Sequence, residues 1–200
     1  MKVRDTLTDS REVRCQACLL QLRGCVCAAL TKVSDNVTHI SIIRHILETK
    51  KVSNTGRFAA TALANSTLHT FGDQFAPLDG SLLRQPDTWL LFPEGAPTTS
   101  MPTPPPKNLI ILDGTWHQAR RMRQRIQALR GLPIVSLPAP AQPRTRMRRP
   151  PSQEAMSTLE AIAAALRLLG EARVADELDV VHEAVVAAAQ LPGRRRLNAV

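Results

Sequence analysis

The sequence predicts an α/β fold, in which a mostly parallel sheet is flanked by helices and preceded by a small cysteine-rich unit. Three observations predict this fold. Short segments that are apolar throughout are typical of strands buried on both faces, and they alternate with segments of helical period. All four cysteines lie near the N-terminus. With 200 residues, 44% of them hydrophobic, the chain is long enough for one domain with a core and a small appendage.

The cysteine-rich unit follows the pattern Cys-x2-Cys-x6-Cys-x-Cys, formed by Cys15, Cys18, Cys25 and Cys27. Because a cytosolic chain keeps its thiols reduced, two disulfides are not expected. Four thiolates in one short segment can surround a single tetrahedral zinc ion. Buried or redox-active thiols are the alternative, but they rarely cluster so exclusively. We therefore predict a closed, structural zinc knuckle over residues 1–30 and a main domain over residues 31–200.

The regular elements of the main domain follow from hydrophobic pattern and composition. Strands are expected over residues 38–43, 89–92, 108–112 and 133–137. Helices are expected over residues 55–68, 117–129, 156–169 and 174–185. The strand over 108–112 is the clearest, because it is a run of branched apolar residues that leads directly into Asp113.

Several boundaries can also be predicted. Ser53 or Asn54 can cap the first helix, because short polar side chains accept hydrogen bonds from the first turn. Ser157 and Glu160 have the spacing of a capping box, which places the start of the first tail helix there. The proline-rich segment over residues 97–106 is expected to be an extended, exposed loop.

The polar residues that follow the predicted strands are the candidate site, because ligands of parallel sheets bind beyond the carboxyl ends of the strands. Purely structural alternatives remain open for them: Asp113 or Thr115 as a helix cap, Glu94 as a turn residue, and Trp116 or His45 in the core. The set comprises Arg44, His45, Glu48, Asn54, Thr55, Arg57, Pro93, Glu94, Gly95, Asp113, Gly114, Thr115, Trp116, Arg120, Ser157, Thr158 and Glu160.

The chain is strongly basic, with a formal net charge of +9 and a pI of about 10.4. Its arginines form clusters that suit a phosphate backbone, and a solvated surface is the alternative. Aromatic residues are scarce at 3%, so a sheet surface that stacks several bases is disfavoured. The candidate RNA-binding residues are Arg121, Arg123, Arg125, Arg144, Arg146, Arg148 and Arg149, and a further cluster lies at residues 194–196.

Other function classes are disfavoured by what the sequence lacks. No apolar run approaches the roughly 20 residues of a membrane-spanning helix, and the N-terminus begins with charged residues rather than an apolar signal region. A cytoplasmic location without membrane partners is therefore expected. Neither the glycine-rich dinucleotide motif nor the phosphate-binding loop of nucleotide hydrolases is present.

The segment from Asp113 to Arg120, Asp-Gly-Thr-Trp-His-Gln-Ala-Arg, resembles the signature of the DTW-domain family, Asp-x-Thr-Trp followed closely by an Ala-Arg pair. Further segments agree with that family in order, and the resemblance spans about residues 15–165. Two positions depart from the pattern: Gln21 stands where the knuckle usually has proline, and the segment before Pro150 lacks a tyrosine. The agreeing segments are the cysteine knuckle, Arg44-His45-x2-Glu48, Asn54-Thr55-x-Arg57, Phe92-Pro93-Glu94-Gly95 and Ser157-Thr158-Leu159-Glu160-Ala161.

The resemblance implies a tRNA-uridine aminocarboxypropyltransferase with a fold related to the knotted SPOUT class. Such an enzyme transfers the 3-amino-3-carboxypropyl group of S-adenosyl-L-methionine to N3 of a tRNA uridine. The catalytic candidates are then Asp113, Thr115 and Trp116. The candidates for binding the donor are Arg57, Pro93, Glu94, Gly95, Arg120, Ser157, Thr158 and Glu160.

The roles of individual residues are left open by the resemblance. Asp113 is expected either to take the N3 proton or to bind the methionine ammonium group. Arg57 or Arg120 can hold the methionine carboxylate, because a guanidinium matches a carboxylate with two hydrogen bonds. Trp116 is expected to pack on the adenine or on the uridine, and Glu94 and Thr115 to complete donor recognition. A SPOUT-like RNA methyltransferase, a non-catalytic zinc-stabilised RNA-binding module, and a structural or regulatory protein are the alternatives.

Overall fold

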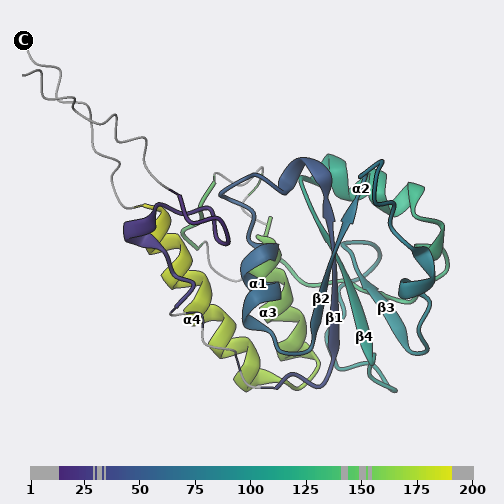
Figure 1. Ribbon diagram of the computed structural model, residues 1–200. Coiled ribbons are helices and arrows are strands. Elements are labelled where there is room, and N and C mark those ends of the chain that lie inside the picture. Colours follow the sequence, from purple (N-terminus) through teal and green to yellow (C-terminus); the bar gives the residue numbers. More distant parts are fainter. Residues whose placement is uncertain are drawn as a thin grey trace, which may run out of the picture.

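The strands form one parallel sheet at the centre of the protein. The computed structural model describes residues 14–28, 30, 33, 35–140, 144–148, 152 and 155–190. Within these residues the sheet has five strands in the order β2-β1-β4-β3-β5, all parallel. They are β1 (His39–His45), β2 (Ser66–Phe71), β3 (Thr88–Leu91), β4 (Asn108–Asp113) and β5 (Ile134–Val135). Their carboxyl ends therefore meet at one edge (Figure 1), and the prediction of a mostly parallel sheet is confirmed.

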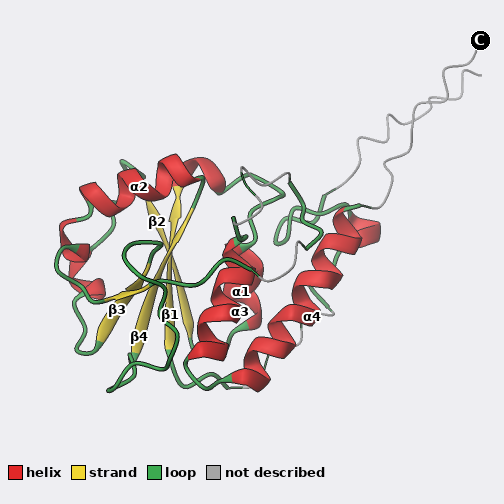
Figure 2. Ribbon diagram, turned by 180° about the vertical axis from the view of Figure 1, so that it is seen from behind, coloured by secondary structure: helices red, strands yellow, loops and turns green. Residues whose placement is uncertain are grey.

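Helices cover the sheet on both sides, as expected. The α-helices are α1 (Gly56–Ala62), α2 (Trp116–Arg125), α3 (Thr158–Leu168) and α4 (Ala172–Ala189). Single-turn 3-10 helices are η1 (Leu22–Gly24), η2 (Ile46–Glu48), η3 (Gly80–Leu83) and η4 (Gln127–Leu129). Figures 1 and 2 show α1, α3 and α4 stacked on one side of the sheet, whereas α2 lies on the other. None of the described helices is long and apolar enough to cross a membrane.

Two separate apolar cores hold these layers together, because side chains of a strand alternate between the two faces of a sheet. Leu109 and Ile111 of β4 pack into the larger core beneath α1, α3 and α4. Ile110, between them, packs against Met122 of α2 in the smaller core. The continuous apolar run Leu109–Leu112 in β4 is thus explained by burial on both faces, which is the reason the sequence pattern identifies this strand.

Most of the predicted elements are confirmed. The strands expected over 38–43, 89–92, 108–112 and 133–137 correspond to β1, β3, β4 and β5. The capping box of α3 is present, with Ser157 N donating to Glu160 Oε2 at 2.8 Å and Glu160 N donating to Ser157 Oγ at 3.3 Å. The proline-rich segment 97–106 carries neither helix nor strand, and most of its side chains are exposed.

The prediction of a single helix over residues 55–68 is wrong beyond Ala62. Leu63 has an extended backbone that ends α1, and β2 begins at Ser66. β2 lies at the edge of the sheet and its side chains are partly exposed, so it lacks the continuous apolar run of the inner strands. Ser66–Phe71 contains threonines and ends in phenylalanine, residue types that favour strands, and this composition could have indicated β2.

The cysteine segment packs on the larger core. Cys18 and Leu20 are buried there together with Leu178 and Val185 of α4. In Figure 1 this purple segment lies beside the C-terminal end of α4. The knuckle therefore shares its core with the helices of the main domain, and a boundary at residue 30 stays a prediction.

Candidate active site

Two cavities open side by side at the carboxyl edge of the sheet. The first has a volume of about 290 Å³ and the second about 380 Å³. They share one wall, built from two helix starts: Gly114 and Trp116 at α2, and Ser157 and Thr158 at α3, with the neighbouring Met156. The candidate motif over residues 113–116 is thus placed between the two cavities.

The first cavity is apolar and carries no charged side chain. Leu91 and Leu112 line it from the ends of β3 and β4, Leu137 lines it from the segment after β5, and Ala161 closes it from α3. Pro138 and Ala139, which follow β5, also line it, and the sequence did not single them out. Residues after the other strands were selected because ligands bind beyond the carboxyl ends of parallel strands. The same reasoning applies to the residues after β5 and would have selected Pro138 and Ala139 as well.

The second cavity differs from the first in its basic side chains. Ser53 and Thr55 line it from the loop before α1, and His117 lines it from α2. Arg146 and Arg148 line it from the segment between β5 and α3. None of its lining residues is acidic. The two neighbouring cavities therefore differ in the kind of ligand that they favour.

Asp113 lies directly behind the shared wall. It ends β4 in register with Arg44 of β1 and is only 1% exposed. Its carboxylate accepts hydrogen bonds from Asn54 Nδ2 at 2.5 Å and from Thr158 Oγ1 at 2.6 Å. Asn54 Oδ1 in turn accepts from Arg57 N at 3.2 Å, in the first turn of α1, although the N-cap of this helix is Thr55 and not Ser53 or Asn54 as predicted. Asp113 thus ties the starts of α1 and α3 to the end of β4.

The electrostatic state of Asp113 follows from this burial. Burial raises the pKa of Asp113, whereas the hydrogen bonds from Thr158 and Asn54 act in the opposite direction. Asp113 lines neither cavity, but Thr158 lines both. The hydroxyl of Thr158 therefore connects both cavities to this buried carboxylate.

Gly56 permits this arrangement. A Cβ atom at this position would lie 2.5 Å from Asp113 Oδ2. Real Cβ atoms do not approach an oxygen so closely, so only glycine allows α1 to begin against the buried carboxylate. The Asn-Thr-Gly-Arg segment over residues 54–57 therefore has a packing reason for its glycine.

Several of the candidate residues line the cavities and several do not. Thr55, Pro93, Gly114, Thr115, Trp116, Ser157 and Thr158 line one or both. Thr115 is also the N-cap of α2, with Gln118 completing a capping box, so its structural alternative is confirmed. Residues that line neither cavity are Arg44, His45, Glu48, Asn54, Arg57, Glu94, Gly95, Asp113, Arg120 and Glu160.

Two of the candidates outside the cavities are engaged elsewhere. Arg57 donates to the backbone carbonyl oxygens of Thr49 at 2.6 Å and Cys18 at 3.2 Å, so it fastens α1 to the cysteine segment. Glu94 is paired with Arg123 at 3.5 Å. A role of either residue in holding a donor stays a prediction, and the geometry gives both of them structural partners.

The family of the chain can be identified at this point, because the motif on the shared wall is a family signature. The family model of the DTW domain matches residues 12–190. The chain belongs to the DTW-domain family. No solved structure gives a significant match.

Curated relatives of this DTW-domain chain carry a functional name. It is 28% identical over 171 residues to "tRNA-uridine aminocarboxypropyltransferase 2" of Macaca fascicularis, which covers 80% of this chain and 57% of that protein. It is 27% identical over 170 residues to the protein of the same name from Drosophila melanogaster, covering 80% of this chain and 68% of that protein. The Mus musculus protein of this name is 27% identical over 171 residues. The chain spans somewhat more than half the length of its macaque and mouse relatives.

The arginines between β5 and α3 of the DTW domain are held in ion pairs. Arg144 pairs with Asp179 and Glu183 of α4. Arg146 pairs with Glu160 through two hydrogen bonds, at 2.7 and 3.1 Å, and both side chains are buried. Arg144 and Arg146 are thus held by carboxylates of the same chain, and a role of the arginines at residues 144–148 in RNA binding stays a prediction. Arg149 and residues 194–196 lie outside the described residues.

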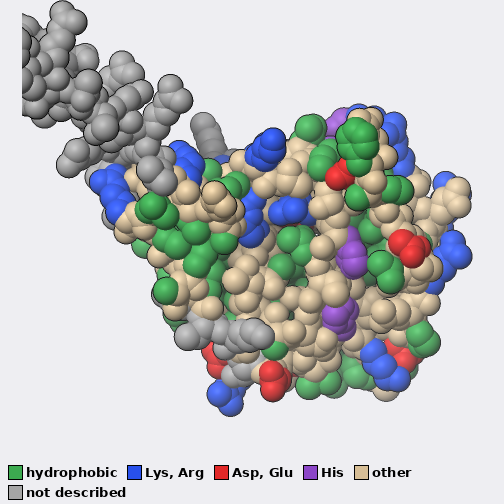
Figure 3. Space-filling model, in the orientation of Figure 1, with side chains coloured by type: hydrophobic (Ala, Val, Ile, Leu, Met, Phe, Trp, Pro, Cys, Tyr) green, Lys and Arg blue, Asp and Glu red, His purple; other side chains and the backbone are tan. Residues whose placement is uncertain are grey.

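Arg148 differs from its two neighbours, because it stays partly open to solvent. It pairs with Glu48 at 3.3 Å, and its side chain is 45% exposed, whereas that of Glu48 is fully buried. Among the other candidates for RNA binding, Arg121 and Arg125 are exposed on α2. In Figure 3, Lys and Arg side chains lie along the upper margin of the molecule, above α1 and around α2. Other Lys and Arg side chains lie at the right and lower margins in the same view.

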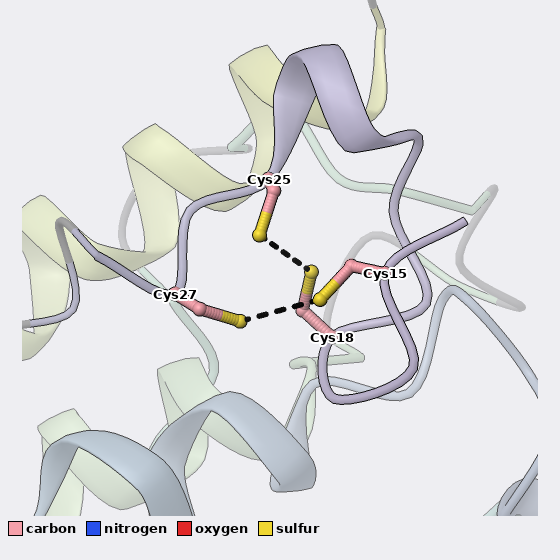
Figure 4. Close-up of side chains that lie close together, drawn as sticks. All are labelled: Cys15, Cys18, Cys25 and Cys27. Carbon is pink, nitrogen blue, oxygen red and sulfur yellow. Dashed lines mark hydrogen bonds between the residues drawn. The ribbon is translucent and has the colours of Figure 1, made fainter. Parts of the chain in front are cut away.

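The four cysteine sulfurs point toward one another (Figure 4). The sulfurs of Cys15 and Cys27 are 3.7 Å apart, and those of Cys18 and Cys25 are 3.8 Å apart. All four sulfurs lie within 4.8 Å of one another. A tetrahedral zinc site with Zn–S bonds of about 2.3 Å requires sulfurs about 3.8 Å apart. The cluster therefore fits one zinc ion with four thiolate ligands and no open position.

The backbone of the knuckle also favours a thiolate at its first cysteine. The N–H groups of Cys18 and Ala17 donate toward the Cys15 sulfur and lower the pKa of this thiol to about 6. The Cys-x2-Cys turn thus aims two backbone donors at a ligand sulfur, which is the arrangement that stabilises negative charge there.

Chelation is expected to destabilise the protein. If zinc is bound at about 1,000 times its dissociation constant, its removal lowers the free energy of unfolding by about 4 kcal/mol, or roughly 10 °C in Tm. Metal analysis of the purified protein should give one zinc ion per chain. Thermal melts with and without chelator, followed by zinc addition, check the effect. A metal-free protein with an unchanged Tm would contradict the prediction.

Proposed function

We propose that this chain transfers the 3-amino-3-carboxypropyl group of S-adenosyl-L-methionine to N3 of a uridine in tRNA. The observation that carries the proposal is the position of the DTW motif at the wall between the two cavities, with Gly114 and Trp116 in the wall and Asp113 behind it, in a chain whose relatives are named for this reaction. The relation to the knotted SPOUT class belongs to the same proposal and is supported by the all-parallel sheet.

The first cavity suits the donor. Apolar walls at the strand ends favour a flat adenine ring, and ligand sites of this kind are lined mainly by such side chains. Trp116 is 39% exposed and borders both cavities. An indole face stabilises a cation more strongly than other rings do, so Trp116 is positioned to contact the sulfonium. When bound, the sulfonium supplies an activated γ-carbon and a neutral thioether leaving group.

The chemistry at the shared wall must place N3 of the uridine against the γ-carbon. N3 loses its proton and forms the new N–C bond while the C–S bond breaks, so that 5′-methylthioadenosine is released. Thr158 takes the N3 proton and passes its own hydroxyl proton to Asp113, whose pKa is raised by burial. Asp113 then acts as the base through Thr158. This geometry supports the expectation that Asp113 takes the N3 proton rather than binding the methionine ammonium group.

The acceptor tRNA is expected to lie over the cavity edge. Arg120, Arg121 and Arg125 are exposed on α2 and suit contacts to the phosphate backbone. Such contacts position the nucleic acid without reading its sequence. Binding of tRNA should therefore weaken steeply as salt is added.

The experiment that tests the proposal uses two forms of labelled donor. Purified protein is incubated with unmodified tRNA and S-adenosyl-L-methionine labelled either in the carboxyl group or in the methyl group, and nucleosides are analysed by mass. Label from the carboxyl group on uridine, with none from the methyl group, is expected. Transfer of the methyl label would identify a methyltransferase, and tight tRNA binding without transfer of either label would indicate a non-catalytic module.

Trp116→Ala is expected to lower kcat/KM by roughly 10- to 100-fold, because the variant loses about 1–3 kcal/mol of ring contact with the reacting cation. Steady-state kinetics with varied donor measure the change. Phe75→Ala is the matched control, since Phe75 is an exposed aromatic residue that lines neither cavity. Equal losses in both variants would exclude a specific role for Trp116.

A further inference from the structure

The second cavity is lined by basic side chains from several elements, and the carboxylates that pair with its two arginines, Glu160 and Glu48, do not line it. Arg146, Arg148 and His117 line it, and no acidic side chain does. The N-termini of α2 and α3 lie at its wall, where Trp116 and Thr158 begin helices of 10 and 11 residues. Helix N-termini carry partial positive charge, although capping boxes occupy some of the N–H groups at both helix starts. The cavity therefore favours an anionic ligand.

His182 is an independent indication of a polar ligand at the same place. It lines the second cavity from α4 and is only 3% exposed. Its Nε2 has no hydrogen-bond partner among the described residues, and the nearest carboxylate oxygen, Glu160 Oε2, is 3.9 Å away. Buried polar atoms are nearly always paired, so an orphaned imidazole at a cavity wall points to a group that enters the cavity.

We propose that the second cavity binds the acceptor uridine nucleotide, with Arg148 and His117 at its phosphate. This inference rests on the proposed function. The charge of the two substrates decides the assignment. The donor carries a net positive charge, from a sulfonium and an ammonium against one carboxylate, so a wall that presents two guanidinium groups and no carboxylate disfavours it. A nucleotide in RNA carries one negative charge per phosphate and is attracted.

The two cavities then define the path of the transferred group. The donor occupies the apolar cavity and the uridine the basic one, and the γ-carbon meets N3 at the wall formed by Gly114, Trp116 and Thr158. This position places N3 beside the only side chain of the described residues that both lines the two cavities and donates a hydrogen bond to Asp113. The polar residues at the starts of α2 and α3 then lie beside the reacting atoms.

Reciprocal blocking of the cavities tests the assignment. Ser53 lines only the second cavity and Ala139 only the first, and neither belongs to the apolar cores. Ser53→Phe is expected to lower transfer at least 100-fold while leaving the Kd of S-adenosyl-L-methionine unchanged by calorimetry. Ala139→Phe is expected to raise that Kd at least tenfold and leave the half-saturating tRNA concentration unchanged. The reverse pattern would overturn the assignment.

A binding measurement separates failure of this inference from failure of the proposed function. Uridine 5′-monophosphate is titrated into the wild-type protein, and Arg148→Ala is expected to raise its Kd about tenfold, the loss of one charge-assisted hydrogen bond. Arg84→Ala removes an exposed arginine that lines neither cavity and should leave this Kd unchanged. Equal Kd values for all three proteins would overturn the inference even if transfer occurs. Absence of transfer with the expected nucleotide binding would instead overturn the proposed function.

Discussion

Asp113→Asn is expected to lower kcat by about 10²- to 10⁴-fold, while the free energy of unfolding at neutral pH stays within about 1 kcal/mol of the wild-type value. An asparagine retains one oxygen that accepts from Asn54 Nδ2, and its amide can donate to Thr158 Oγ1, which turns from donor to acceptor. The tie between β4, α1 and α3 is thereby kept. What is lost is a carboxylate that can receive a proton through Thr158.

Asp113→Ala is the matched variant that removes the tie as well. It leaves Asn54 Nδ2 and Thr158 Oγ1 buried without their acceptor, and it is expected to lower the free energy of unfolding by about 2–4 kcal/mol. Urea denaturation and single-turnover kinetics of both variants separate structure from catalysis. Full activity of Asp113→Asn would show that Asp113 only positions the helix starts, and that the proton leaves by another route.

The pH dependence of the free energy of unfolding tests the raised pKa of Asp113 independently of catalysis. Burial raises the pKa of Asp113 above that of the unfolded chain, so folded protein binds the proton more tightly than unfolded protein does. The stability that Asp113 contributes is then fully present below the unfolded pKa and is lost as pH rises through the folded pKa. Asp113→Asn should therefore gain stability relative to wild type as pH rises from 4 to 7. A constant difference would contradict a raised pKa.

The inner strands could be predicted because burial on both faces leaves a pattern within each segment. β3 and β4 contain continuous apolar runs and β1 contains Ile40, Ile42 and Ile43, and the edge where these strands end follows from their parallel arrangement. β2 could not be found in this way, because only one neighbour pairs with it and its side chains are partly exposed. Because the segment before β2 is rich in alanine, the sequence predicted a helix that continues to residue 68.

The roles of charged residues depend on partners that are distant in sequence. Arg144 pairs with Asp179, 35 positions later, and Arg148 with Glu48, 100 positions earlier, so neither pair leaves a local signal. The spacing of Arg144, Arg146 and Arg148 by two residues was a partial signal, since an extended segment points alternate side chains to one side. Composition alone could not distinguish this internal use of arginine from a surface that binds RNA.

The sequence predicted which residues gather at the candidate site better than it predicted which of them face a cavity. Residues after the strands and at the start of α3 do meet at one edge, as the sequence indicated. Which of them face a cavity depends on side-chain packing: Asp113 is buried behind Gly114, and Arg57 turns toward the cysteine segment. His182 had no local signal, because it lies on a tail helix far from the motif.

Arg146→Met is expected to lower the free energy of unfolding by about 3–5 kcal/mol at pH 7, because it leaves the carboxylate of Glu160 buried without its partner. Glu160 also caps α3 by accepting from Ser157 N, so the wall shared by the two cavities should loosen in the same variant. Urea denaturation measures the change. Arg173→Met is the control, since Arg173 pairs with Glu177 on the exposed side of α4 and such pairs contribute little.

The pH dependence of this variant has a defined sign. In the wild type, burial acts to raise the pKa of Glu160, but hydrogen bonds from Arg146 and Ser157 bring it below the usual value, so its contribution is present above the unfolded pKa and lost as pH falls. Without Arg146, burial dominates and the contribution is lost as pH rises instead. The deficit of Arg146→Met should therefore shrink between pH 7 and pH 4. Adding Glu160→Gln to Arg146→Met removes the unpaired charge and should recover most of the lost free energy of unfolding at pH 7. Losses of the two single variants that simply add in the double variant would show that the two side chains act independently.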